Sequence, residues 1–186
     1  MTLSSLAKLP LSAEEGWPEL ARRRPALLRV FFLLVVPLSL LPPALLYFVG
    51  IDLPPALARP APRDGATVAI VFLLAEIATF AAMGWLIRKV ANTYALAIDY
   101  HDAYLLAAIA PVPLWLSSLG LLIPGLAASA AISLVALGLS CALLHHGLQA
   151  LGRQRDAIVA AGVVQIVIGA GLIAWALLLS LAFVRL

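Results

Sequence analysis

The chain has 186 residues, of which 64% are hydrophobic and only 11% are charged. Soluble domains contain about 45–50% apolar and about 25% charged residues, so this composition excludes an ordinary water-soluble protein. The formal net charge of +3 does not indicate a nucleic-acid partner, because the basic residues flank apolar segments, as membrane anchors do. The sequence predicts an all-α integral membrane protein, a bundle of five transmembrane helices.

A polar leader precedes the apolar segments and covers residues 1–26. Gly16 and Pro18 predict that at most a short turn forms there. Trp17 and Leu20 are expected at the level of the lipid headgroups, where amphipathic side chains are favoured. A basic collar completes the leader, and we interpret it as a topology signal, with an anionic-lipid site as the alternative. The collar consists of Arg22, Arg23, Arg24 and Arg29.

Five apolar segments form the membrane domain, residues 27–186, and each is long enough for the roughly 20 residues that a bilayer requires. Their predicted bounds are about 27–49, 67–87, 104–123, 127–148 and 158–184. The first segment is expected to kink, because it contains Pro37, Pro42 and Pro43. Residues 50–66 are predicted to be a proline-rich loop, and residues 124–125 a tight turn.

Small residues indicate how two of these helices pack. The fourth segment has small residues four apart, such as Ala136 and Ser140, and the fifth contains Gly162, Gly169 and Gly171. Close backbone approach is the main source of helix association in a bilayer, so the fourth and fifth helices are predicted to pack together.

The distribution of lysine and arginine predicts the orientation. Nine of the twelve basic residues fall on one side of the predicted spans and three on the other. Because cytoplasmic loops are enriched in these residues, the N-terminus is expected in the cytoplasm and the C-terminus outside.

Glu76 is the candidate intramembrane polar residue, since it lies near the middle of the second predicted span. Acidic residues at that depth are costly, face the bundle interior and often carry function. Pro113 is expected at a similar depth, where it would free the carbonyl of Ile109 to accept a hydrogen bond from a protonated Glu76. Two interpretations stay open: a proton- or cation-handling site, or a neutral carboxyl that hydrogen-bonds two helices together.

The most polar internal segment, residues 88–103, contains a candidate partner-docking loop made of Asp99, Tyr100, His101 and Asp102. Asp102 is predicted to cap the following helix. Tyr94, Tyr100 and Tyr104 are expected to form an aromatic belt at the membrane surface. The spacing matches no strong metal motif, so we predict no metal and no cofactor here.

Several segments carry a family likeness: Ala82-Met83-Gly84, Asn92-Thr93-Tyr94, the run from Asp102 to Leu114 and the run from Ser117 to Pro124. Together they resemble the Yip family of five-span membrane proteins, in particular its bacterial inner-membrane, YohC-type branch. In that branch an aromatic-led helix with an Ala-x-Pro-Leu core ends in a proline turn. A small-residue helix follows, with a glycine near its end, here Gly147. The likeness covers roughly residues 68–184.

This resemblance implies a multi-pass inner-membrane protein, and no clear biochemical activity comes with it. The eukaryotic branch binds Rab-type GTPases, but its Asp-Leu-Tyr-Gly-Pro stretch is absent from this chain. No nucleotide loop, catalytic triad or zinc-protease helix is present either, so we predict no enzyme. Two functions stay open: a membrane organiser that binds lipid, another membrane protein or a second copy, and a small permease or lipid-moving protein that uses Glu76.

Overall fold

The computed structural model describes residues 16–49, 65–123, 125–152 and 156–185. Within these ranges all regular secondary structure is helical and no strand occurs, as the sequence predicts. Residues 50–64 of the predicted loop at 50–66, and the proline of the predicted turn at 124, lie outside the described residues, whereas residues 65–66 begin a helix.

The leader contains a helix, α2 (Trp17–Arg23), so the prediction of at most a turn is wrong. Pro18 stands in the first turn of α2, where its missing N–H removes no intrahelical hydrogen bond. Glu19 and Arg23 add an ion pair of 2.6 Å one turn apart. Trp17 and Leu20 are only 0% and 3% exposed, so both side chains are buried against the rest of the protein.

The first apolar segment is divided into four short helices. They are α3 (Leu27–Val30), the π-helix η1 (Phe31–Val35), α4 (Val36–Ser39) and α5 (Leu41–Val49). The wide π-turn ends directly before α4, whose first turn contains Pro37, a residue that cannot donate a backbone hydrogen bond. The predicted disturbance by prolines is thus confirmed, and it takes the form of a π-helix and a break at Leu40.

The remaining helices form the body of the bundle. They are α6 (Gly65–Thr93), α7 (Tyr100–Ile109), α8 (Val112–Ser117), the 3-10 helix η3 (Ser118–Leu122), α9 (Leu126–Leu151) and α10 (Ala157–Arg185). The third predicted span is interrupted between α7 and α8, where Pro111 caps α8 and Pro113 stands in its first turn. Residues 88–93 extend α6, so much of the polar segment is helical.

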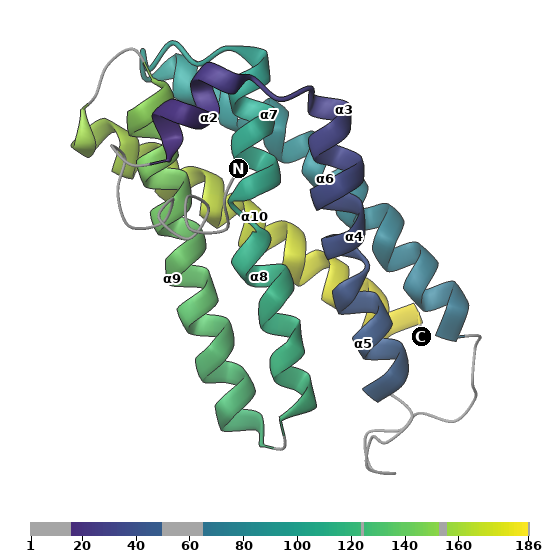
Figure 1. Cartoon of the computed structure of the whole chain (residues 1–186). Coiled ribbons are helices and arrows are strands. Elements are labelled where there is room, and N and C mark those ends of the chain that lie inside the picture. The colour runs from purple at the N-terminus through teal and green to yellow at the C-terminus, as the bar shows by residue number, and fades with distance from the viewer. Residues whose placement is uncertain (1–15, 50–64, 124, 153–155, 186) are drawn as a thin grey trace.

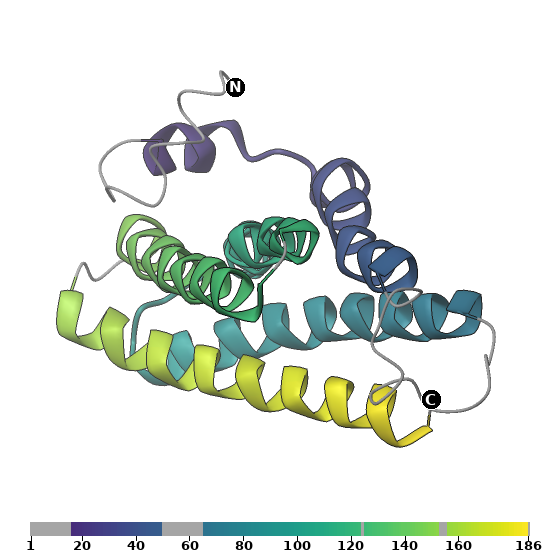
Figure 2. The ribbon, with the colours of Figure 1, turned by 90° about the horizontal axis from the view of Figure 1, so that it is seen from below.

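α6 and α10 run side by side in opposite directions, and α7, α8 and α9 pack over them (Figures 1 and 2). α9 contacts α10, as predicted, but the glycines of α10 do not make that contact. A Cβ atom on Gly171 would lie 3.5 Å from Met83 of α6. A Cβ atom on Gly162 or Gly169 would meet nothing within 4 Å, so these two positions face open space.

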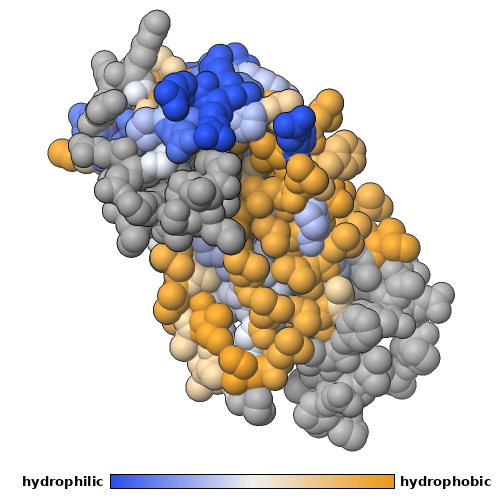
Figure 3. Space-filling model, viewed as in Figure 1, coloured by the Kyte–Doolittle hydropathy of each residue, from blue (hydrophilic) through white to orange (hydrophobic). Residues whose placement is uncertain are grey.

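Four segments of the described residues are long and apolar enough to cross a membrane: Leu27–Leu45, Tyr100–Leu122, Ala127–Leu151 and Ala157–Ala174. Their outward faces carry large apolar side chains, as a lipid solvent requires; Ile158, for example, is 84% exposed. Hydrophilic side chains gather at one end of the visible face (Figure 3). We call this the polar end, where α2, the start of α7 and the last turns of α6 and α9 meet.

Candidate functional site

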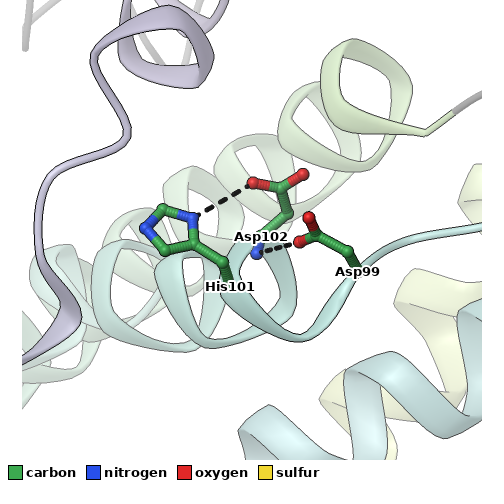
Figure 4. A group of neighbouring side chains, drawn as sticks. All are labelled: Asp99, His101 and Asp102. Carbon is green, nitrogen blue, oxygen red and sulfur yellow. Dashed lines mark hydrogen bonds and ion pairs between the residues drawn. The ribbon is translucent and has the colours of Figure 1, made fainter.

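Asp99 positions the predicted docking loop, residues 99–102, because it is the N-cap of α7. Its carboxylate accepts a hydrogen bond of 2.8 Å from the backbone N–H of Asp102 (Figure 4). The prediction that Asp102 is the cap is therefore wrong by one turn: Asp102 occupies the third helical position, and Asp99 satisfies its N–H.

The linker that leads into this loop is held by Asn92 at the end of α6. The Asn92 side chain accepts a bond of 2.8 Å from the N–H of Ile98 and donates one of 3.1 Å to the carbonyl of the same residue. Ala95 and Ala97 have positive φ angles of 61° and 51°, which the tight path of the linker requires. Sequence reasoning missed this clamp, although an asparagine before a short linker is typical of such local bonding.

The leader lies against the docking loop. The guanidinium of Arg24 pairs with the carboxylate of Asp99 and lies 3.8 Å from that of Asp102. Burial of the Asp99 carboxyl works to raise its pKa, but the Asp102 N–H and the Arg24 charge outweigh it and hold the pKa below its ordinary value. Since Arg24 and Asp99 are each about half exposed, the pair alone contributes little stability.

His101 makes a second link to the leader. Its Nε2 atom lies 2.9 Å from the carbonyl oxygen of Pro25, and its Nδ1 atom lies 3.3 Å from the carboxylate of Asp102. Figure 4 shows the ribbon of the leader passing beside the imidazole ring. The docking loop therefore binds two consecutive residues of the leader, one by charge and one by its backbone.

Trp17 provides the third link, an apolar one. Its ring fills a notch in α9 that exists because residue 147 is glycine: a Cβ atom there would lie 2.7 Å from the ring and would also collide with Leu106. Gly147, which the sequence marked only as part of a family pattern, thus accommodates the leader. Trp17, Arg24 and Pro25 together fix the leader across the polar end.

The ligand atoms of Asp99, His101 and Asp102 all lie within 4.8 Å of one another, a spacing short enough for one cation. These side chains already bind the leader, and Arg24 supplies a positive charge between the two carboxylates. The cluster therefore binds a basic segment of the chain's own leader.

The predicted aromatic belt is divided between the surface and the interior. Tyr94 and Tyr100 are exposed, whereas Tyr104 lies between α7 and α6. Its hydroxyl donates a bond of 3.1 Å to the carbonyl of Ala81, and its ring lies so close to Gly84 that an added Cβ would be 2.7 Å away. Tyr100 stacks on Tyr104 with ring centroids 4.4 Å apart, which leaves Tyr100 as the exposed aromatic side chain of the docking loop.

The basic collar is divided too. Arg24 binds the docking loop and Arg23 binds Glu19 within α2. Arg22 and Arg29 are exposed and have no ion pair among the described residues. Only part of the collar is therefore left to contact anionic lipid.

Glu76 lies inside the bundle, on α6, with the side chain of Trp115 on α8 beside its carboxyl group. Its Oε2 atom is buried without a hydrogen-bond partner among the described residues. The partner predicted from the sequence was a carbonyl freed by Pro113; the described residues show no hydrogen bond of that kind to Glu76, and Trp115 is the polar side chain beside the carboxyl. The signal that was missed is that a tryptophan within an apolar helix needs an acceptor for its N–H.

Trp115 is itself held by a small apolar cluster. It packs with Val35 of the π-helix η1 and with Ala108 of α7, so the segmented first span contacts the helix that carries the partner of Glu76. The buried carboxyl and the docking loop are separate sites: Glu76 lies toward the middle of α6, and the loop lies at the polar end.

Comparison with known families places these features in context. The model of the Yip1 domain matches residues 9–178 of the chain, which include the leader helix, the docking loop and Glu76. No curated protein and no solved structure matches the chain. The Yip1 family is not a known enzyme family. The chain therefore belongs to the Yip1 domain family of membrane proteins.

Proposed function

We propose that the protein is a non-catalytic organiser in the bacterial inner membrane, of the YohC type, which binds a protein partner at its polar end. The observation that carries the proposal is the docking loop, where Asp99, His101 and Asp102 converge on a basic segment of the leader. The clamp by Asn92 and the cap by Asp99 hold the loop in place, and a fixed loop suits recognition.

We further propose five membrane crossings, with the polar end in the cytoplasm. Besides the four candidate spans, the continuous 29-residue helix α6 would be the remaining crossing. Support comes from the alternating course of the helices between the two ends of the bundle (Figure 1) and from the excess of lysine and arginine on the leader side.

Site-specific photocrosslinking in living cells tests the partner. A photoreactive residue at Tyr100, which is 53% exposed on the docking loop, is expected to give a discrete crosslinked protein. The same residue at Leu116, an exposed position on α8 away from the polar end, is the matched control. The product should disappear when Asp99 and Asp102 are both changed to asparagine. A product that forms equally from Leu116, or that ignores the carboxylates, would exclude this surface.

A second candidate function is that of a small permease or lipid-moving protein, and the environment of Glu76 favours it. One carboxyl oxygen is buried without a partner, and the adjoining first span contains a π-helix, a feature often found at functional sites. Interrupted helices around a membrane-embedded carboxyl are also common in transporters.

Reconstitution in proteoliposomes distinguishes the two functions. Proton flux and lipid scrambling are measured for the wild type and for Glu76→Gln, in which an amide replaces the carboxyl at nearly constant volume. Loss of flux, or of its pH dependence, in the variant would establish the transport function. If both proteins are folded and neither shows flux, the transport function is excluded and the organiser function remains.

A further inference from the structure

A groove of about 230 Å³ lies between α6 and α10, the two long helices that run side by side (Figure 2). Small side chains line it: Ala170 and Ala174, one helical turn apart on α10, and Ala82 on α6. Trp85 and Leu86 line the part of the groove nearest the polar end, and Trp85 is 60% exposed. The groove is therefore open to the surroundings of the bundle.

The lining of the groove is apolar. Its one hydroxyl belongs to Thr79, which donates a hydrogen bond of 2.8 Å to the carbonyl of Ala75 within α6. The groove therefore requires no polar group from a ligand. Ala170 and Ala174 also belong to the candidate membrane span Ala157–Ala174, so lipid chains are the solvent expected at the mouth of the groove.

Two cations follow the groove on α6, toward the polar end. Arg88 and Lys89 stand three and four residues after Trp85, so both are its neighbours on the helix surface. Ala82, Leu86 and Lys89 recur at the spacing that places side chains on one face of a helix. The hydrocarbon stem of Lys89 can thus extend the groove while its ammonium group reaches the lipid headgroups.

These two cations are exposed, and neither forms an ion pair within the part of the chain that the structure describes. The acidic residues described at the polar end are engaged elsewhere. Asp99 and Asp102 face Arg24, Glu19 pairs within α2, and Asp156 accepts two backbone N–H bonds at the start of α10. Two adjacent positive charges therefore lie next to an apolar groove without a counter-ion.

We propose that the groove and the two cations form a binding site for one anionic phospholipid. An acyl chain lies between α6 and α10, and the phosphate contacts Arg88 and Lys89. Basic pockets between membrane helices are known to hold anionic headgroups in this way. The ring of Trp85 lies between chain and phosphate, the level that tryptophan favours in a bilayer. The site shares no residue with the docking loop and is independent of the proposed protein partner.

A second copy of the chain suits this face less well than a lipid does. Helices associate in a bilayer by close approach of their backbones, and the exposed ring of Trp85 stands at the edge of the small-residue surface. A two-fold pair of chains in one membrane orientation would also bring Arg88 and Lys89 of both copies together at the same level. A lipid phosphate neutralises these charges instead.

Photolabelling of the full chain in lipid nanodiscs tests the site. The nanodiscs consist of phosphatidylcholine with a small fraction of phosphatidylglycerol that carries a photoreactive diazirine on one acyl chain. Mass spectrometry of the digested protein is expected to find the label on the lining residues of α6 and α10. Added unlabelled phosphatidylglycerol should compete for this label, whereas phosphatidylcholine with the same acyl chains should not.

Two charge variants test the headgroup contact. Arg88→Gln and Lys89→Gln should each raise the mole fraction of photoreactive lipid needed for half-maximal labelling about fivefold, the usual effect of one basic residue at an anionic membrane surface. Arg29→Gln is the matched control, because it makes the same change of charge at an exposed position on α3, and it should label like the wild type.

A variant of α10 tests the acyl chain separately. Ala170→Leu fills the groove and should reduce the label although both cations remain. Ala161→Leu is the matched control: Ala161 is exposed and, nine residues earlier, lies on the opposite side of α10, so its label should be unchanged.

Three outcomes would overturn the proposal. The first is equal competition by the two lipids, and the second is label that neither Arg88→Gln nor Lys89→Gln weakens. The third is a dimer in native mass spectrometry that Ala170→Leu dissociates, because a second copy would then occupy the groove. None of these outcomes affects the crosslink expected from Tyr100, so the lipid site and the proposed function stand or fall separately.

Discussion

Gly147 has no side chain, and the space this leaves on α9 accommodates Trp17 of the leader. Gly147 is the residue of α9 that Trp17 covers, and a side chain there would occupy the space of the indole ring. The chemistry of the leader is thus matched to one position on a helix that is far away in sequence. This contact depends on the steric fit of Trp17 against Gly147. The local sequence around either residue does not predict it.

Gly147→Ala is expected to displace Trp17 and to detach α2. An added methyl group in a filled site destabilises the folded protein by about 1–3 kcal/mol. Detachment of α2 removes this steric strain, and the detached leader then becomes sensitive to protease. Limited trypsin digestion in detergent measures this, since trypsin cleaves after arginine. Gly138→Ala is the matched control, because it lies on the same helix with nothing within 4 Å of an added Cβ. Equal cleavage of both variants would mean that Trp17 does not occupy the notch.

The pair of Glu76 and Trp115 is the second contact that acts at this scale. Glu76→Gln should change stability little, because an amide of nearly the same size can take the place of the carboxyl beside Trp115. Glu76→Leu should cost about 0.5–2 kcal/mol, the range of hydrogen bonds between membrane helices. Unfolding in mixed detergent measures both, and a double variant with Trp115→Phe should show coupling between the two sites. If the losses of stability from the two substitutions simply add, Glu76 and Trp115 do not interact.

At the scale of the element, the start of α7 combines a structural and a binding role. Asp99 caps the helix through one oxygen and pairs with Arg24 of the leader through the other. The same carboxylate therefore stabilises the start of α7 and binds the leader. These two contacts hold the loop in place although it lies at the surface.

The two roles of Asp99 can be separated by substitution. Asp99→Asn keeps a capping oxygen and loses the charge, at a cost of about 0–1 kcal/mol for an exposed pair. Asp99→Ala loses the cap as well, which costs about 1 kcal/mol more. Thermal unfolding in detergent measures the difference between the variants. Equal losses from the two substitutions would show that the cap contributes no stability.

The charge of Asp99 also predicts a response to acid. Because its pKa is lowered from 3.8, the stability that it contributes is fully present above that value. It is lost as the pH falls through the lowered pKa. The wild type should therefore lose stability relative to Asp99→Asn when both are titrated below pH 3.8. Parallel curves for the two proteins would contradict the pairing with Arg24.

The helices could be predicted from the sequence, whereas the long-range contacts between them could not. Hydropathy located the apolar segments to within a few residues, and the cost of a buried charge singled out Glu76. Arg24 and Asp99, however, are 75 residues apart, and each looks locally like a surface charge. The helix α2 was missed because Pro18 was taken as a breaker, although the first helical turn tolerates proline. Trp115 was missed because the partner of Glu76 depends on how α6 and α8 pack.

At the scale of the whole molecule, the described residues form a bundle with a polar end and an apolar surface along the helices. The leader, the docking loop and the ends of α6 and α9 share that polar end, and apolar side chains dominate the surface along the spans (Figure 3). All features assigned here to partner binding therefore lie at one end of the bundle, and the proposed crossings put that end on one side of the membrane. Their function depends on which side that is.

The accessibility of single cysteines to a membrane-impermeant maleimide in intact cells tests this claim most directly. In a Cys141→Ala background, Ile123→Cys lies at the opposite end of the bundle and should be labelled from outside. Tyr100→Cys, at the polar end, should be labelled only after the cells are opened. Labelling of Tyr100→Cys in intact cells, with Ile123→Cys protected, would place the docking loop outside the cytoplasm and contradict the account.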